Sequence, residues 1–284
     1  MTTISTKHVV VTGGASGIGR LVAGQMAALG ASVTLVDKDS AGLLRAESEL
    51  CAAGGDARTA VCDVGDKAAV AAAADEIVSA AGPVDILVNN AGVVSGRLLL
   101  DLTDEQIERT FRVNTLALFW TTRAFLPGMI ERGFGHVVTV ASAAGLIGTC
   151  RETDYAASKH AAIGFNEALR MELHRLAPGV HTTIVCPYYI DTGMFSGVRT
   201  RIPLLLPILK EEQVAARIVR AVQLNRPQVQ MPWMVRTLPL TRLLPVAAFD
   251  RIADMLGLNA CMDEFCGRAP APSVAAPEAQ EARG

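Results

Sequence analysis

The sequence predicts an α/β protein built on a single doubly wound parallel sheet (Rossmann-type) with helices on both faces. Short runs of β-branched residues alternate with helical stretches of about ten residues or more, and strands joined in this way pair in parallel. The strand runs are continuously apolar, as expected for strands that are buried on both faces. Of the 284 residues, 50% are hydrophobic and 19% are charged, so the chain can bury a large aliphatic core.

The first half of the chain repeats the order of strand and helix. The expected elements are a strand at 8–12, a helix at 19–29, a strand at 32–36, a helix at 40–53, a strand at 57–62, a helix at 67–81 and a strand at 86–88. A glycine follows each of these helices, at Gly30, Gly54 and Gly82, which is the usual residue after a helix C-terminus. These residues therefore predict three strand–helix units and a fourth strand.

The second half continues the alternation with longer helices. The expected elements are a helix at 103–132 that Pro127 interrupts, a strand at 136–141, a helix at 153–176 and a strand at 180–185. No linker divides the chain, so we expect one domain over 1–267, with a substrate lid at about 190–212 and a helical segment at about 233–258. The Ala- and Pro-rich end, 268–284, has too few large apolar groups to order itself and is expected to be a flexible tail.

Composition excludes several classes of protein. There are 26 Lys and Arg residues against 28 Asp and Glu, with no dense basic stripe, so nucleic acid is not an expected partner. The six cysteines form no CxxC pair and have no histidine at ligand spacing, which favours reduced, mostly buried thiols over disulfides or a metal site. Without a signal peptide or a long uncharged apolar run, we expect a soluble cytoplasmic protein.

A glycine-rich turn joins the first strand to the first helix. It reads Thr12-Gly-Gly-Ala-Ser-Gly-Ile-Gly19, and its glycines let a pyrophosphate approach backbone N–H groups at the positive end of the helix. The spacing is TGxxxGxG and differs from the dinucleotide-binding GxGxxG. The expected cofactor contacts in this turn are Gly13, Ser16, Gly17, Ile18 and Gly19, although a purely structural turn would have the same glycines.

Acidic and amide side chains end the next strands. Asp37 follows Gly19 by 18 residues, where a carboxylate binds the ribose 2′-OH and repels a 2′-phosphate, so it favours NAD, while Lys38 opposes that inference. Asp63 ends the third strand, where an aspartate that only caps a turn is nearly as good an interpretation as a cofactor contact. Asn89-Asn-Ala-Gly92 closes the fourth strand, and such a turn on its own means little.

The most specific pattern is Tyr155-Ala-Ala-Ser-Lys159, with Ser142 upstream at the end of a strand. The i, i+4 spacing places the phenol and the ammonium group on one helix face. A neighbouring cation lowers the pKa of a tyrosine, which suits proton transfer near neutral pH. Alone, the pair could be a chance surface Tyr and Lys, but it occurs together with the glycine turn and the strand-end asparagines.

Taken together, these motifs resemble the classical short-chain dehydrogenase/reductase family over about residues 6–230. The resemblance implies that Ser142 orients the substrate oxygen, Tyr155 transfers the proton and Lys159 binds the nicotinamide ribose. It also implies a fourth catalytic position at Asn114, associated with a helix kink and a proton-relay water. The implied cofactor contacts beyond the glycine turn are Asp37, Asp63 at the adenine, Val64, Asn90, Ala91, Gly92, Tyr155, Lys159, Pro187, Ile190 and Thr192. One departure is Tyr188, where the family usually has glycine after the proline.

The region after Met194 indicates the kind of substrate. Residues 195–209 are markedly apolar, which fits a hydrophobic substrate, although a lid that packs on its own domain would also be apolar. The segment from Cys186 to Phe195, with the Leu-, Pro- and Arg-containing stretch that ends at Leu258, resembles the retinol and 17β-hydroxysteroid dehydrogenase branch. That resemblance implies bulky lipophilic alcohols. Residues 233–258 could touch a bilayer surface, but core packing or subunit contact in a homodimer or homotetramer is the favoured interpretation.

The sequence therefore predicts an NAD(H)-dependent oxidoreductase that interconverts a bulky hydrophobic alcohol, of steroid, retinoid or aryl type, and its ketone or aldehyde. Two alternatives stay open. One is a reductase of a polar or acyl-carrier-bound oxo group, which the apolar lid disfavours. The other is a catalytically idle dinucleotide-sensing scaffold, which the intact Ser142, Tyr155 and Lys159 disfavour.

Overall fold

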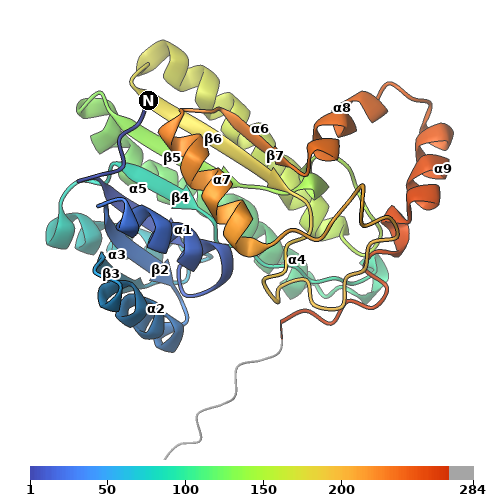
Figure 1. Cartoon of the computed structure of the whole chain (residues 1–284), viewed down its shortest axis with the longest axis horizontal. Helices are drawn as coiled ribbons and strands as arrows, with labels where there is room; N and C mark the ends of the chain where they lie inside the picture. The colour runs from blue at the N-terminus through green and yellow to red at the C-terminus, as the bar shows by residue number, and fades with distance from the viewer. Residues whose placement is uncertain (269–284) are drawn as a thin grey trace, which may run out of the picture.

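A seven-stranded parallel sheet forms the centre of the protein, seen here in a computed structural model that describes residues 1–268 (Figure 1). The strand order is β3-β2-β1-β4-β5-β6-β7. The strands are β1 (His8–Thr12), β2 (Ser32–Asp37), β3 (Asp56–Val61), β4 (Ile86–Asn89), β5 (Gly135–Val140), β6 (Val180–Pro187) and β7 (Gln228–Met231). The predicted doubly wound parallel sheet is confirmed, and β7 is an edge strand that the sequence analysis did not predict.

Helices cover both faces of this sheet (Figure 1). One face is covered by α1 (Gly17–Ala28), α2 (Ser40–Ala52) and α7 (Glu211–Gln223), and the other by α3 (Lys67–Ala81), α5 (Ala117–Glu131) and α6 (Thr153–Leu176). Side chains of neighbouring strand residues point to opposite faces, so Val9 and Val11 pack toward α1 and α7 while Val10 packs toward α3 and α5. Both sets are fully buried, which explains why the strand runs are apolar without alternation.

The strand order changes direction between β1 and β4. The chain runs from β1 outward to β2 and β3, and then returns to add β4 on the other side of β1. In sheets of this kind, ligands bind in the crevice at the carboxyl ends of the strands beside this switch point. The glycine-rich turn after β1 and the Asn-Asn-Ala-Gly segment after β4 therefore meet at one edge of the sheet.

The long helix expected at 103–132 is interrupted at a different place from the one predicted. Its parts are α4 (Asp104–Phe111), a π-helical segment (Arg112–Leu116) and α5, and Pro127 lies inside α5. The prediction of a break near Pro127 is wrong. Phe125 and Met129, on either side of the proline, are buried against the sheet, and this packing stabilises the continuous helix. The irregularity lies instead around Asn114.

Short helices follow β7 and extend beyond the sheet (Figure 1). They are a 3₁₀ turn (Trp233–Thr237), α8 (Leu238–Thr241), α9 (Val246–Leu256) and a second 3₁₀ turn (Leu258–Ala260); two other 3₁₀ turns lie at Leu99–Asp101 and Ala143–Gly145. The expected helical segment at 233–258 is thus present in pieces. Large apolar side chains on it are more than 60% exposed, so core packing does not account for all of them; these are Trp233, Leu240, Leu243, Val246 and Met255.

Two further expectations can be compared with the structure. Among the described residues, no helix is both long and apolar enough to span a bilayer. Of the six free thiols, Cys62, Cys186 and Cys261 are buried, but Cys51, Cys150 and Cys266 are exposed, so the expectation of mostly buried cysteines holds for half of them. Apart from Arg268, the predicted tail at 268–284 lies outside the described residues.

Candidate active site

A cavity of about 810 Å³ lies at the carboxyl ends of the strands. It runs from the glycine-rich turn, past the Tyr155 and Lys159 pair, to a wall of apolar side chains. Sixteen sequence-predicted site residues line it, namely Gly13, Ser16, Gly17, Ile18, Asp37, Asp63, Val64, Asn90, Ala91, Gly92, Ser142, Tyr155, Lys159, Pro187, Ile190 and Thr192. Gly19 and Asn114 do not line the cavity, so their parts in the site are indirect.

The glycine-rich turn brings backbone unusually close to backbone. Gly13 has φ +67°, and a Cβ on it would lie 2.8 Å from the Asn90 amide nitrogen. A Cβ on Gly19 would clash with the carbonyl oxygen of Gly13. The turn leads straight into α1, whose first N–H groups have no partner within the helix, so a cradle for an anionic group such as a pyrophosphate is present.

Asn90 and Thr12 hold the ends of β4 and β1 together. The Asn90 amide donates to the carbonyl oxygens of Thr12, at 2.9 Å, and Gly13, at 3.2 Å. The Thr12 hydroxyl accepts from the backbone N–H groups of Asn90 and Ala91. Thr12 is a positioning residue to which the sequence analysis gave no role, and its place directly before the glycines was the signal available.

The two acidic strand ends differ in what they contact. Asp37 accepts hydrogen bonds from the backbone N–H groups of Ala15, at 3.2 Å, and Asp39, at 3.1 Å, so its carboxylate is held beside the glycine-rich turn. Asp63 accepts from the N–H of Gly65 at 2.9 Å. Asp63 therefore makes the local turn that was its alternative interpretation, and it also lines the cavity. The residues at this end fit a dinucleotide.

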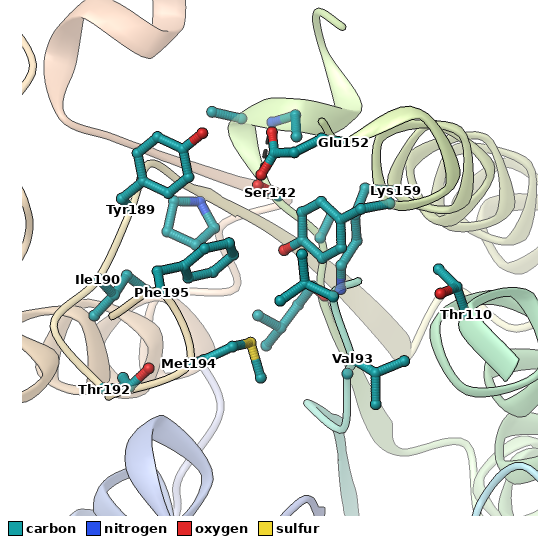
Figure 2. Close-up of a pocket in the computed structure, with 18 of the residues that line it drawn as sticks. Val93, Thr110, Ser142, Glu152, Lys159, Tyr189, Ile190, Thr192, Met194 and Phe195 are labelled. Atoms are coloured by element: carbon teal, nitrogen blue, oxygen red, sulfur yellow. Dashed lines mark hydrogen bonds between the residues drawn. The ribbon is translucent and has the colours of Figure 1, made fainter. Parts of the chain in front are cut away.

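Tyr155 and Lys159 come from the start of α6, and Ser142 follows β5. Lys159 donates from Nζ to the carbonyl oxygen of Val140 at 2.9 Å, and its Nζ lies 5.6 Å from the centre of the Tyr155 ring. Figure 2 shows Lys159 on one side of the cavity, Tyr189 and Phe195 on the other, and Ser142 between them. The Phe195 ring meets the Tyr155 ring edge-on at 5.9 Å between centres.

Burial dominates the acidity of this pair. It raises the pKa of Tyr155 above its usual value, Glu152 raises it further, and a hydrogen bond to Ser142 opposes the shift. Burial also lowers the pKa of Lys159 to about 8. The expected lowering of the Tyr155 pKa is wrong for this structure, because burial of the phenol raises the pKa, while the Lys159 ammonium group bonds a backbone carbonyl. Tyr155 is therefore a neutral phenol with a proton to donate.

Asn114 lies behind the site in the π-helical segment. Its side chain accepts from the N–H of Val93 at 2.8 Å and donates to the carbonyl oxygen of Val93 at 2.9 Å and to the Ser158 hydroxyl at 3.0 Å. Only 1% of the residue is exposed. These contacts hold the chain that follows Gly92 against α6, while the implied part in a proton relay stays a prediction.

Glu152 is a site residue that the sequence analysis did not identify. It lines the cavity and is 1% exposed, and its carboxylate accepts a hydrogen bond from the Thr149 hydroxyl. Its second oxygen has no hydrogen-bond partner among the described residues. Burial raises the pKa of this carboxyl group to about 7. A lone glutamate before a helix gives no sequence signal for such a position.

The far end of the cavity is apolar. Side chains from the predicted lid and from the C-terminal segments form it, namely Met194, Phe195, Leu206, Met234, Leu238, Leu256, Leu258 and Phe265. Within the predicted lid, Leu206 is 6% exposed but Leu204 is 96% exposed, so the apolar residues there do not all face the cavity. Tyr188, the departure from the family pattern, packs against Tyr189 and contacts the Cys261 thiol at 3.5 Å.

Comparison with known proteins decides what this site is. The sequence profile described as short chain dehydrogenase matches residues 7–202, which is more than half of the chain. The chain belongs to the short chain dehydrogenase family. This family of oxidoreductases accounts for the fold and for the arrangement of Ser142, Tyr155 and Lys159 in the cavity, so the protein is an enzyme of that class.

Individual relatives agree with this assignment. Epidermal retinol dehydrogenase 2 from human is 40% identical over 92% of this chain and 86% of its own. A short chain dehydrogenase/reductase from Burkholderia phymatum, solved with NAD, superposes with a TM-score of 0.78 at 30% identity, over 86% of this chain and 95% of its own. A metagenomic short-chain oxidoreductase solved with NADP gives a TM-score of 0.68 at 29% identity, over 81% and 96%.

Proposed function

We propose that this short chain dehydrogenase interconverts a bulky hydrophobic alcohol and its ketone or aldehyde with NAD(H). One observation carries the proposal: a single cavity joins a dinucleotide cradle, a buried Tyr155 and an apolar wall. The likeness to a retinol dehydrogenase supports the choice of substrate class. The apolar wall argues against a polar or acyl-carrier-bound oxo group, and the intact Ser142, Tyr155 and Lys159 argue against an idle scaffold.

The chain's own residues position the substrate and move the proton. When the dinucleotide is bound, its nicotinamide ring supplies the hydride-transfer chemistry. Ser142 orients the reacting oxygen, and the Tyr155 hydroxyl gives its proton to that oxygen during reduction and takes it back during oxidation. Lys159 would hold the nicotinamide ribose. The apolar wall excludes water from the reacting atoms, which strengthens each of these polar contacts.

A substrate screen tests the proposal as a whole. Purified enzyme is assayed with NAD and with NADP against retinoid, steroid, aryl and small aliphatic alcohols, and against the matching carbonyl compounds. We expect the highest kcat/KM with NAD and a bulky lipophilic alcohol. Activity confined to polar or carrier-bound oxo compounds, or no turnover with any of them, would overturn it.

Asp37 supports NAD over NADP, because its carboxylate lies beside the glycine-rich turn where a 2′-phosphate would be repelled. Asp37→Ala is expected to narrow the NAD preference, measured as the ratio of the two kcat/KM values, by about tenfold. Lys38→Ala, which removes the neighbouring cation, should shift the ratio in the opposite direction, toward NAD. A wild-type enzyme that prefers NADP would contradict this interpretation of Asp37.

Leu206 tests the hydrophobic substrate. It lies in the cavity wall and packs with Ile147 and Leu258, so Leu206→Ala removes apolar contact area from the substrate end. We expect kcat/KM for a bulky alcohol to fall about tenfold, since burial of a leucine contributes about 1.5–3 kcal/mol, while a small alcohol changes little.

The control for this experiment is Leu204→Ala, two residues away and 96% exposed, which should behave as wild type. The comparison counts only if Leu206→Ala keeps its melting temperature and its NAD affinity. Equal losses on bulky and small alcohols would mean that this wall does not distinguish substrate size.

Assembly and location are further proposals from the sequence. The exposed apolar side chains of 233–258 fit contact between subunits in a homodimer or homotetramer, and contact with a bilayer surface is the disfavoured alternative. A cytoplasmic location stays a prediction. Light scattering after size-exclusion chromatography, with and without added vesicles, separates the two kinds of contact.

A further inference from the structure

A strap at the C-terminal end of the described chain crosses the whole cavity. We define the C-terminal strap as residues 258–268. At its start, Leu258 packs in the apolar substrate wall, and at its end Gly267 and Arg268 line the cavity beside the glycine-rich turn. Phe265 lies between them, with its ring against Gly96 and 6.5 Å from the centre of the Phe195 ring. One stretch of chain thus touches the substrate end and the cofactor end.

Contacts along its length determine the path of the strap. Cys261 and Met262 are 3% and 1% exposed and pack with Tyr189. The Cys266 backbone N–H donates to the Ser196 carbonyl oxygen at 2.9 Å. These contacts continue to Gly267, whose N–H also donates to the Ser196 carbonyl oxygen, and none of them involves the Arg268 side chain.

Arg268 bridges the two loops that flank the cofactor site. Its Nη1 donates to the Ser16 hydroxyl at 2.9 Å, and its Nη2 donates to the Thr192 carbonyl oxygen at 3.3 Å. Its Nη2 also lies 3.8 Å from where a Cβ on Gly17 would be. Ser16 is the N-cap of α1, so the guanidinium group sits at the N-terminus of that helix.

This location is electrostatically unusual. A helix N-terminus carries partial positive charge and favours anions, so a cation there is unfavourable unless an anion lies between the two. A guanidinium group has planar donors that match phosphate oxygens in pairs, which distinguishes it from a lysine. The glycine-rich turn was assigned above to a pyrophosphate, and that group would satisfy both positive partners.

We propose that Arg268 binds the pyrophosphate of the dinucleotide, so that the C-terminal strap closes over the bound cofactor. The proposal rests on the proposed function only in requiring a dinucleotide cofactor. Both NAD and NADP contain a pyrophosphate, so it does not depend on which of them the enzyme prefers.

The test is the affinity of the full chain for three probes, measured by calorimetry without any alcohol present. All three probes contain adenosine: NAD adds the pyrophosphate and the nicotinamide, ADP-ribose adds the pyrophosphate without the nicotinamide, and adenosine itself has neither. We expect Arg268→Ala to raise the Kd of NAD and of ADP-ribose about tenfold while the Kd of adenosine stays within about twofold. Arg268→Lys keeps the charge without the paired donors, so its Kd values for NAD and ADP-ribose should lie between those of wild type and Arg268→Ala.

A control variant and a second measurement accompany this test. Arg170→Ala removes an exposed arginine on α6 and should leave every Kd unchanged. Hydrogen exchange of the strap should slow when NAD binds to the wild type, and slow less in Arg268→Ala. Unchanged or tighter NAD binding by Arg268→Ala overturns the proposal, as does an equal loss for adenosine and ADP-ribose. Since no turnover is measured, its failure is separate from failure of alcohol oxidation.

Discussion

Tyr155→Phe is expected to lower kcat by about 100-fold or more while the Kd of NAD stays within about twofold of wild type. The change removes only the hydroxyl group, and general acid–base groups typically contribute 10²–10⁴-fold to turnover. The ring remains, so its edge-on contact with Phe195 and the packing around it are kept. Steady-state kinetics on the best alcohol, with NAD affinity from calorimetry, give the two numbers.

Tyr189→Phe is the matched control for this prediction. It removes the same group from a second buried tyrosine of the same cavity, and it should cost much less turnover. If Tyr155→Phe turned over within a few-fold of wild type, another group would move the proton, and Glu152 would be the first to examine because its carboxyl group lines the same cavity.

Gly19→Ala is expected to weaken NAD binding by about 100-fold or more and to lower the melting temperature. The added methyl group would clash with the Gly13 carbonyl oxygen, which belongs to the backbone of the turn and cannot rotate away. The turn must open, and the Asn90 amide that bonds the same carbonyl loses its geometry. Calorimetry with NAD and a thermal melt measure the two effects.

Gly24→Ala controls for the chemistry of the substitution. Gly24 lies five residues further along α1, where a Cβ would make only an ordinary contact with Leu50. Alanine is the better helix former by up to about 1 kcal/mol, so this variant should be as stable as wild type or more so, with unchanged NAD affinity. If Gly19→Ala bound NAD as tightly as wild type, the turn would tolerate opening, and the close approach of Gly19 to the Gly13 carbonyl oxygen would not be needed for cofactor binding.

Much of the fold followed from the sequence for physical reasons. Strands buried on both faces must be apolar throughout, and glycines end helices because they adopt a positive φ, as Gly30, Gly54 and Gly82 do here. The strand β7 escaped prediction because it is a four-residue edge strand with polar alternate residues. The helix α7 was also not predicted, although its sequence carries an amphipathic pattern, with Val214, Ile218 and Val222 on one buried face.

The candidate site was predictable where local motifs encode it. The glycine turn, the strand-end asparagines and the Tyr-Lys pair each have a spacing that reports their geometry, and the structure brings them to one cavity. Glu152 and Arg268 reach that cavity through long-range packing, which no short pattern records. The direction of the Tyr155 pKa shift was predicted wrongly for the same reason, since the shift depends on how deeply the ring is buried and on where the lysine side chain points.

The buried Glu152 also links folding to proton uptake. Its pKa is about 7 in the folded chain against an ordinary 4.5, so the folded state holds this proton longer and stability falls as pH rises from about 4.5 to 7. His136 acts in the opposite sense, because burial lowers its pKa from 6.5 to about 3, and stability rises with pH over that interval.

Where the two intervals overlap, at about pH 4.5–6.5, the Glu152 slope opposes the His136 slope, and it therefore makes the melting temperature rise less steeply with pH. His8 and His181 act in the same sense as His136, because burial lowers the pKa of each. Glu152→Gln removes the opposing slope, so the melting temperature of this variant should rise more steeply toward neutral pH than that of wild type. Equal slopes in the two proteins would mean that Glu152 keeps an ordinary pKa.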